Sequence, residues 1–363
     1  MIISEVIRVI TLLFLVVITN NISSEPMQDM DHHEHHHGME SHSNHTAKMH
    51  GPIGLMGDHL LRKGKFMVSI RYMKMSMDQN YIDSQEVSDE EILQLPNPNG
   101  MPINLSVVPQ KMDMDMIMLG TMYAPTDHIT LMSMAAFNSK SMSLRTYQPM
   151  MKRNAIGDFT TKSSDLSMVN LSALLKIFDQ DGSKFHAQLG IQKDVGKNNI
   201  NGQALMPMGS FGSVVMPYGM QGGDKSLSIL SAVTFTRSYG NWKFGGQIRS
   251  KKNIQSKEWN YGDSDELNLW TQRDLNNISA WSLRLKVQDV KSIDGLDKYI
   301  KAPVQTANPI NYGGKKVSLG VGINILLSKG TIGLEAYKPI SRDLNGPQMG
   351  MDWGFQVGYL LSF

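Results

Sequence analysis

The sequence predicts an all-β protein: a transmembrane antiparallel β-barrel of about 12 strands, preceded by a disordered His/Met-rich N-terminal tail. Three observations predict this fold. Segments in which apolar and polar residues alternate recur from Phe66 to the end of the chain. The connections between these segments alternate between short and long, which is typical of outer-membrane barrels. The last segment alternates regularly and ends on the aromatic residue Phe363.

The composition narrows the class of protein. The 363 residues carry a formal net charge of +2 and only 19% of them are charged, so we expect no nucleic-acid partner. The absence of cysteine excludes a disulfide framework and a thiolate metal site. Methionine is unusually common, with 28 residues, and only Met349 and Met351 follow Met220. This uneven distribution indicates a methionine-rich side of the molecule.

The N-terminal region divides into two parts by composition. Residues 1–24 predict a secretory signal peptide, because Arg8 precedes an apolar run over residues 9–18 that is too short to span a bilayer. Residues 25–50 are polar and of low complexity, and we expect them to form a tail in the periplasm. The tail holds eight histidines that we predict as metal ligands: His32, His33, His35, His36, His37, His42, His45 and His50. Imidazole binds copper, nickel and zinc, and a solvated disordered tail is the alternative interpretation.

Residues 51–65 form a third region, which precedes the predicted barrel at residues 66–363. Its glycines and Pro52 are incompatible with a regular helix or strand, yet Ile53 and Leu55 are too apolar for a free linker. We therefore predict a plug or lid at the mouth of the barrel.

The barrel strands are predicted from segments with a period of two residues. The clearest is Met112–Tyr123, where the methionines share one face and Ile117 and Leu119 lie on the other. In Phe66–Met77 the methionines share a face with Arg71, which would cost roughly 2–4 kcal/mol in the middle of a lipid-facing strand, so this face is the interior. The other predicted strands are residues 129–137, 166–177, 185–192, 227–237, 242–249, 267–273, 281–288, 317–327, 332–337 and 351–363.

The connections between the predicted strands are of two kinds. Short connections with turn residues occupy residues 124–128, 179–184, 238–241, 274–277 and 328–330. Long connections occupy residues 78–111, 138–165, 193–226, 250–266, 289–316 and 338–350. Outer-membrane barrels have short periplasmic turns and long outer loops, so we expect both chain termini on the periplasmic side.

The same alternation predicts which side chains line the lumen. Methionines on the inward face are candidate ligands for soft metal ions: Met73, Met75, Met112, Met114, Met116, Met118, Met122, Met132 and Met134. Polar and basic residues are expected on the facing wall: Arg71, Lys176, His186, Lys243, Arg249, Arg284 and Lys286.

Three blocks of the sequence resemble a known family. They are residues 51–78, which contain GPIGLMGDH and RKGKFMVSIRYMKMSMD, residues 116–134 (MIMLGTMYAPTDHITLMSM) and residues 159–175 (FTTKSSDLSMVNLSALL). Over most of its length the chain resembles, at the level of pattern, the exported outer-membrane transporters grouped with the meta-pathway of phenol degradation. The resemblance implies an outer-membrane β-barrel, and it implies little about the substrate.

Three functions are compatible with such a lumen. Thioethers select Cu(I) and Ag(I), and successive weak sites permit conduction, so we favour an outer-membrane channel for soft or transition-metal ions. A flexible apolar wall would instead suit small hydrophobic or aromatic organic compounds. A non-conducting structural barrel is the third hypothesis. We expect no enzymatic activity, because neither His128 nor His186 has a serine at a suitable spacing.

The expected location and partners follow from the barrel. We predict a place in the bacterial outer membrane, in contact with its lipid, and insertion by the outer-membrane assembly machinery, since the final strand resembles the assembly signal of outer-membrane proteins. A metal ion or a small-molecule solute is the expected ligand. No cofactor is expected to be required, and copper, silver and zinc are the candidate bound ions.

Overall fold

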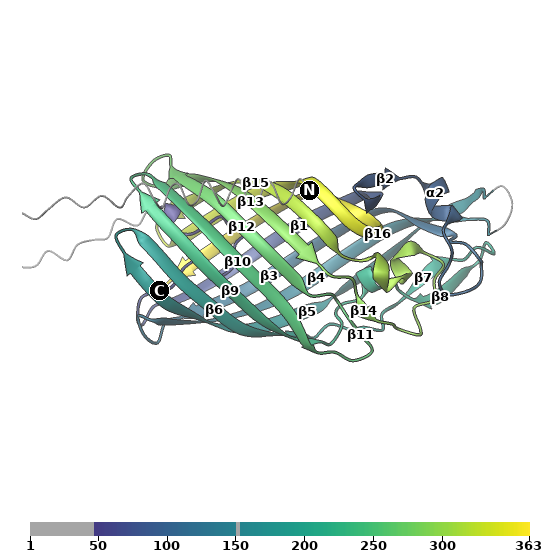
Figure 1. Ribbon diagram of the computed structural model, residues 1–363, viewed down its shortest axis with the longest axis horizontal. Coiled ribbons are helices and arrows are strands. Elements are labelled where there is room, and N and C mark those ends of the chain that lie inside the picture. Colours follow the sequence, from purple (N-terminus) through teal and green to yellow (C-terminus); the bar gives the residue numbers. More distant parts are fainter. Residues whose placement is uncertain (1–46, 150–152) are drawn as a thin grey trace, which may run out of the picture. The chain divides into compact units, whose positions relative to one another are not determined.

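The computed structural model describes residues 47–149 and 153–363 (Figure 1). The predicted signal peptide, and the predicted tail with all of its histidines except His50, lie outside the described residues. Within the described ranges, no helix is both long enough and apolar enough to cross a membrane.

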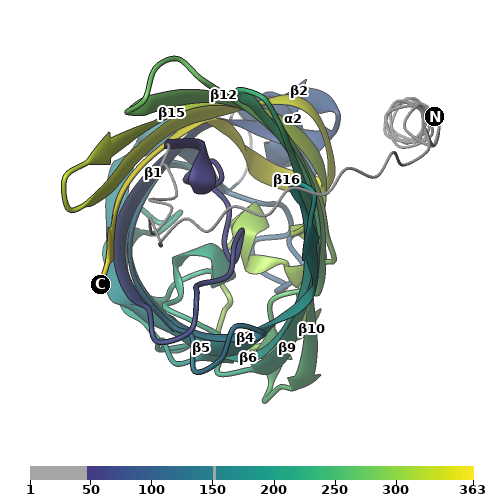
Figure 2. The ribbon, with the colours of Figure 1, turned by 90° about the vertical axis from the view of Figure 1, so that its left-hand side faces the viewer.

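Eleven strand elements of the described chain form one closed antiparallel ring, seen end-on in Figure 2. Each of these strands pairs with its neighbours in chain order, and the last strand pairs with the first, which closes the ring. The elements are β1 (Phe66–Asp83), β3 (Val107–Tyr123), β4 (Ile129–Tyr147), β5 (Ala155–Gln180), β6 (Ser183–Asp194), β9 (Leu227–Tyr239), β10 (Trp242–Gln255), β12 (Ser264–Asp274), β13 (Ser279–Val290), β15 (Gly314–Leu327) and β16 (Gly330–Ser362). The predicted all-β antiparallel barrel is confirmed.

The element β16 provides two successive strands of the barrel wall. Residues 330–344 pair with β15, and residues 344–362 pair with β1. Lys338 Nζ lies 3.5 Å from Asp352 Oδ1, a contact that residues this far apart on a straight strand cannot make. The chain therefore folds back between them. If the two halves of β16 are counted separately, the ring formed by the described residues has twelve strands, in agreement with the predicted number.

The remaining strands and helices are not part of the closed ring. The short strand β2 (Gln85–Val87) pairs with β1 at the outer edge. The long connections contain α2 (Asp89–Gln94), the hairpin of β7 (Asn201–Leu205) and β8 (Phe211–Val215), and the pair of β11 (Trp259–Asn260) and β14 (Asp294–Gly295). They also contain the 3-10 turns η2 (Tyr218–Met220), η3 (Gln305–Ala307) and η4 (Pro309–Asn311), and a further turn, η1 (Ala47–Met49), precedes β1.

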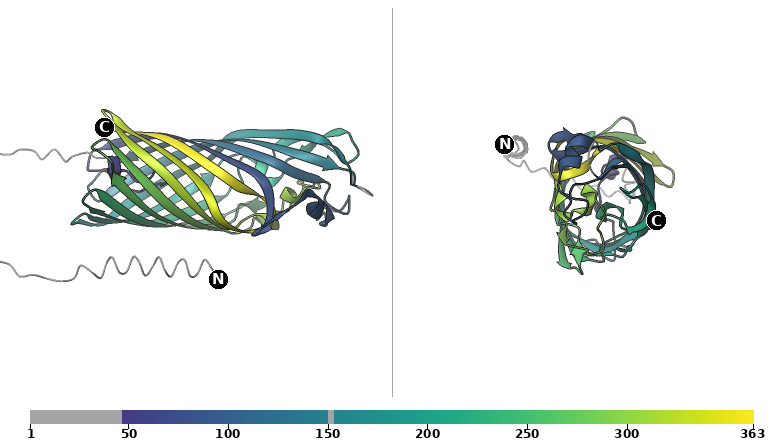
Figure 3. Two further views of the ribbon diagram at one scale, coloured as in Figure 1. Left: turned by 90° about the horizontal axis from the view of Figure 1, so that it is seen from above. Right: turned by 90° about the vertical axis from the view of Figure 1, so that its right-hand side faces the viewer.

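Every predicted strand lies within an observed strand, except that the last one extends to Phe363 while β16 ends at Ser362, and several strands are longer than predicted. Two predicted long connections, residues 138–165 and 338–350, are mostly strand (Figure 3). In the first, β4 continues to Tyr147 and β5 begins at Ala155, and the second lies entirely within β16. Outside the lipid, the outward face no longer needs apolar side chains, while the backbone hydrogen bonds continue. The alternation on which the prediction rested is therefore lost before the strand ends.

The two ends of the barrel differ in their connections. We call the end with the turns at residues 124–128, 181–182, 240–241, 275–278 and 328–329 the short-turn end, and the opposite end the long-loop end. In the turn between β5 and β6, Asp181 and Gly182 both have positive φ, at 50° and 74°. This backbone conformation matches the twist of a two-residue hairpin.

The outward face of the ring is apolar. Exposed leucine, isoleucine and valine side chains recur on successive strands, such as Leu119 on β3 and Leu171 on β5, which are 55% and 61% exposed. On β3, Ile117 and Tyr123 are exposed on this same face, while Met112 and Met122 are buried on the other. A continuous apolar outer surface of this kind is the lipid-facing band of a membrane barrel.

The last residue of the chain closes the ring. The Phe363 N–H donates to the Phe66 carbonyl at 2.8 Å, the Phe66 N–H donates back at 3.4 Å, and the two rings lie 6.2 Å apart. Deleting Phe363 removes both hydrogen bonds, each worth about 0.5–1.5 kcal/mol. We expect a smaller fraction of folded barrel, measured by heat-modifiable migration on gels. The control Phe363→Tyr keeps the bonds and the ring, and full folding of the deletion variant would contradict the prediction.

Candidate functional site

An inner segment, residues 47–61, lies inside the ring near the short-turn end, where Figure 2 shows it in purple. Ala47, Ile53 and Leu55 are buried there. The predicted disordered tail ended at residue 50, but residues 47–50 are ordered against the wall.

Basic side chains of two strands hold the inner segment. Arg71 Nη1 on β1 donates to the carbonyls of Ile53 and Leu55 at 2.8 and 2.6 Å. Lys243 Nζ on β10 donates to the carbonyls of Lys48 and Met49 at 3.1 and 2.8 Å. Because an irregular backbone inside a barrel has no ladder partners, these charge-assisted bonds satisfy its carbonyls.

Neutral polar side chains complete this anchoring. Four more carbonyls of the inner segment are hydrogen-bonded to side chains of the wall: His50 to Gln272 Nε2 at 2.9 Å and Asn324 Nδ2 at 3.1 Å, Gly51 to Asn324 Nδ2 at 3.0 Å, Met56 to Gln247 Nε2 at 3.0 Å and Gly57 to His186 Nε2 at 2.8 Å. The inner segment is thus hydrogen-bonded to strands all around the ring.

Two glycines allow the inner segment to pass close to the wall. A Cβ on Gly54 would collide with the side chains of Arg284 and Gln356. Gly57 has a φ of +65°, and a Cβ there would lie 2.7 Å from Gln188 Oε1. The positive φ of Gly57 favours glycine there, whereas a side chain at position 54 would have to displace the ends of Arg284 and Gln356.

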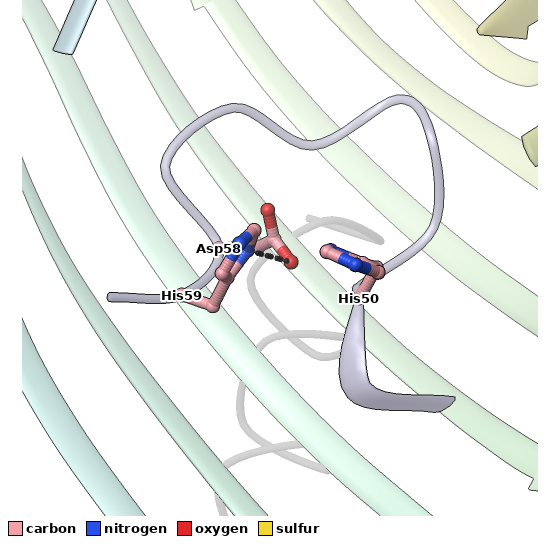
Figure 4. Close-up of side chains that lie close together, drawn as sticks. All are labelled: His50, Asp58 and His59. Carbon is pink, nitrogen blue, oxygen red and sulfur yellow. Dashed lines mark ion pairs between the residues drawn. The ribbon is translucent and has the colours of Figure 1, made fainter. Parts of the chain in front are cut away.

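Three side chains of the inner segment gather in one place: His50, Asp58 and His59 (Figure 4). His59 Nδ1 lies 3.0 Å from Asp58 Oδ2, and the Gly51 N–H donates to the same oxygen at 2.6 Å. The rings of the two histidines meet edge to face with centroids 4.7 Å apart. Burial, followed by the neighbouring charge of His59, lowers the pKa of His50 to about 3. Burial by itself would raise the pKa of Asp58, but the nearby His59, Lys243 and His50 bring it well below its usual range.

Methionines of β1, β3 and β4 face one another across neighbouring strands. The directly opposite pairs are Met67 with Met122, Met73 with Met116, Met75 with Met114, Met77 with Met112, Met112 with Met142, and Met122 with Met132. Met112, Met122, Met132 and Met134 are buried. We call the partly exposed set Met73, Met75, Met114, Met116 and Met118 the methionine wall. Because these side chains face inward in a closed ring, their exposed surface is turned to the lumen.

Beyond the methionine wall, the long loops pack into the mouth of the barrel. Tyr218 lies against Trp259 and Tyr312, with ring centroids 4.8 and 6.0 Å apart. The same apolar core includes the inward-facing Met112 and Met142, so the loops lie within the long-loop end. The methionine wall therefore lies between the inner segment and this loop core.

The polar lumen residues predicted from the sequence all lie on strands of the ring. Arg71, His186, Lys243 and Arg284 are buried, while Lys176, Arg249 and Lys286 are partly exposed. The structure brings the first three onto the inner segment. Arg284 forms a buried ion pair with Glu335 and donates to Asn268 Oδ1 at 2.9 Å. Lys286 pairs with Glu266 at 2.8 Å, and Arg249 lies opposite Glu266 in the strand register.

Two basic side chains of the ring lie beside the methionine wall. Met118 lies opposite Arg71, and Met114 lies opposite Lys140. Lys140 donates to the carbonyls of Gly219 and Gln221 at 2.9 and 2.7 Å. Among the described residues, neither Arg71 nor Lys140 is in an ion pair with a carboxylate. The sequence analysis missed Lys140 because it lies in a predicted loop.

Two cavities lie on opposite sides of one stretch of wall. On the outer side, a depression of about 610 Å³ crosses β3 to β9 and is lined by apolar residues such as Leu131, Leu171 and Ile191. On the inner side, a cavity of about 10 Å³ is lined by residues 56–59 of the inner segment. Three lining residues are common to both cavities: Thr121, Met132 and Ser133.

Comparison with solved structures identifies a similar barrel. No family model matches the chain, and no curated protein matches it by sequence. An outer membrane channel from Pseudomonas putida F1 is similar in structure, with a TM-score of 0.53 and 13% sequence identity over 86% of this chain and 100% of that one. The fold is that of an outer-membrane β-barrel.

Two other solved structures resemble the barrel less closely. The β domain of the Bordetella autotransporter BrkA has a TM-score of 0.45 and 9% identity, over 83% of this chain and 100% of that one. The Pseudomonas putida toluene transporter TodX has a TM-score of 0.41 and 9% identity, over 84% of this chain and 91% of that one.

Proposed function

We propose that this outer-membrane barrel is a channel for small hydrophobic or aromatic organic compounds. The observation that carries the proposal is the partly exposed methionine wall beside unpaired basic side chains. Flexible thioether side chains adapt to apolar ligands of different shapes. The basic groups would attract a solute that carries a carboxylate or phenolate, since a basic lumen concentrates anions.

The outer depression supports the same solute class. Its volume of about 610 Å³ lies in the range of small-molecule sites, and its lining is apolar. Thr121 and Ser133, which line both this depression and the inner cavity, have small side chains. A hydrophobic compound would partition into this depression from the membrane.

The inner segment acts, in this proposal, as the plug of the short-turn end. Its carbonyls are bonded to strands around the ring, so the plug would leave only by breaking several bonds together. We place the short-turn end in the periplasm and the long loops outside the cell. The partners would be outer-membrane lipid, the assembly machinery and the organic solute.

Conduction of soft metal ions is the second candidate function. The methionine pairs Met73–Met116 and Met75–Met114 favour it, because opposed thioethers are suitable donors for Cu(I) and Ag(I). The unpaired charges of Arg71 and Lys140 beside these pairs oppose it, since they repel cations. We therefore favour transport of an organic solute over conduction of soft metal ions.

Substitution of the methionine wall distinguishes the two functions. We expect Met114→Gln with Met116→Gln to reduce uptake of benzoate or toluene into vesicles several-fold, because amides make the wall polar. Leucine at both positions should preserve uptake, since exchange of Met for Leu usually costs less than about 1.5 kcal/mol in packing. Met208→Gln, in an exposed loop, is the control.

The opposite pattern would overturn the proposal. If the leucine variant loses Ag(I) binding and metal flux, while organic uptake never exceeds that of empty vesicles, the barrel conducts soft metals. If neither solute enters and the folded barrel is intact, the non-conducting structural barrel is correct.

A further inference from the structure

We propose that His50, Asp58 and His59 bind one transition-metal ion of borderline softness, such as Zn(II) or Cu(II). One ligand atom from each residue lies within 4.8 Å of the other two (Figure 4). All three belong to the inner segment, and none belongs to the methionine wall. The proposal therefore does not depend on the proposed function.

The donor set determines the class of metal. Two imidazoles and one carboxylate are ligands that zinc and copper accept, and they leave room for a further ligand. His50 Nδ1 and His59 Nε2 are buried without a hydrogen-bond partner, whereas His59 Nδ1 faces Asp58 Oδ2 at 3.0 Å. Buried nitrogens without partners cost free energy, and a metal ion would satisfy two of them by coordination.

The surroundings offer space of the right size. A cavity of about 10 Å³ lies beside two of the three ligands: Asp58, His59 and Arg71 line it, and His50 does not. This volume is close to the minimum for one water-sized species. A single ion fits the space, and an organic ligand does not.

The backbone on both sides of the three ligands is already fixed. The His50 carbonyl accepts a bond from Gln272 at 2.9 Å, and the Gly57 carbonyl is bonded to His186 at 2.8 Å. Asp58 is oriented by the Gly51 N–H. Metal binding would therefore close the loop of residues 50–59 with little loss of chain entropy.

The neighbouring charges predict selectivity. Arg71 and Lys243 act electrostatically on His50 and Asp58, and the site contains one carboxylate. Mg²⁺ and Ca²⁺ bind mainly through several oxygen ligands and charge, so two nearby cations exclude them. Zinc and copper bind imidazole strongly enough to enter such a site.

The test uses the full-length chain with the seven other tail histidines replaced by serine: His32, His33, His35, His36, His37, His42 and His45. Titration of the purified barrel with ZnCl₂ should show one bound ion per chain, with no binding of Mg²⁺. Because even loss of an outer contact weakens metal sites by 10–100-fold, Asp58→Asn and His59→Gln should each weaken binding about tenfold or more. His128→Gln, in an exposed turn, should leave binding unchanged.

A second measurement separates metal loss from misfolding. Heat-modifiable migration on gels reports whether each variant forms the barrel, and the near-isosteric Asp58→Asn keeps an oxygen that can accept the Gly51 bond. Folded variants that retain one zinc ion per chain would overturn the proposal. So would a folded, tail-substituted barrel that binds no zinc at all.

Discussion

Replacing Glu335 with leucine is expected to destabilise the barrel by about 3–5 kcal/mol, because it leaves the Arg284 guanidinium buried without its counter-charge. The two side chains are only 5% and 1% exposed. Gln356 Nε2 also donates to Glu335 Oε1, at 3.3 Å. Denaturant unfolding in detergent, followed by loss of heat-modifiable migration, would measure the loss of stability.

The double variant Arg284→Met with Glu335→Leu provides the control. Replacing a buried ion pair with apolar side chains of similar size is often neutral, so the double variant should recover most of the lost stability. Exchange of the exposed pair Arg145 and Asp158 for neutral residues should change stability by less than about 1 kcal/mol. A single Glu335→Leu variant as stable as the parent would contradict this account.

Replacing Arg71 with methionine is expected to release the inner segment. The variant loses two charge-assisted bonds to the carbonyls of Ile53 and Leu55, each worth about 1.5–3 kcal/mol. Trypsin should then cleave after Lys48 at least about tenfold faster, since a factor of ten corresponds to about 1.4 kcal/mol. Mass spectrometry of the fragments would identify this cleavage, and the conductance of the barrel should rise as well.

The matched control for Arg71→Met is Arg145→Met, which removes an outward guanidinium from β4. It should change neither cleavage nor conductance. Cleavage after Lys48 that is equally slow in Arg71→Met and in the parent would show that Arg71 does not hold the segment. Conductance that rises without faster cleavage would point to a change in the lumen itself.

The strands and their inward faces could be predicted because the signal is local. In Met112–Tyr123 the alternation of methionine with Ile117 and Leu119 is contained in a dozen neighbouring residues, and the structure places these residues on opposite faces. Arg71 was decisive, since a single charge cannot face lipid at low cost. The register that opposes Met73 with Met116 depends on turn geometry and could not be predicted.

The loop core and the site in the inner segment depend on contacts between distant residues. Nothing near Tyr218 in the sequence indicates that Trp259 and Tyr312 pack against it. His50 was predicted as a metal ligand within the tail, whereas Asp58 and His59 were not, because residues 51–65 were treated as a plug or lid only. The spacing of His50 to Asp58 and His59, with glycines between, was the available signal.

The pairing of β1 with β16, which closes the ring, affects the order of folding. It pairs Met67 with Ser362, residues separated by nearly the whole barrel sequence. Contacts of such long sequence separation form late, because the intervening chain must first be ordered. Until then β1 and the second half of β16 are unpaired edges, which aggregate readily. The entire chain must therefore be present before the ring can close, and both edges are prone to aggregation during that interval.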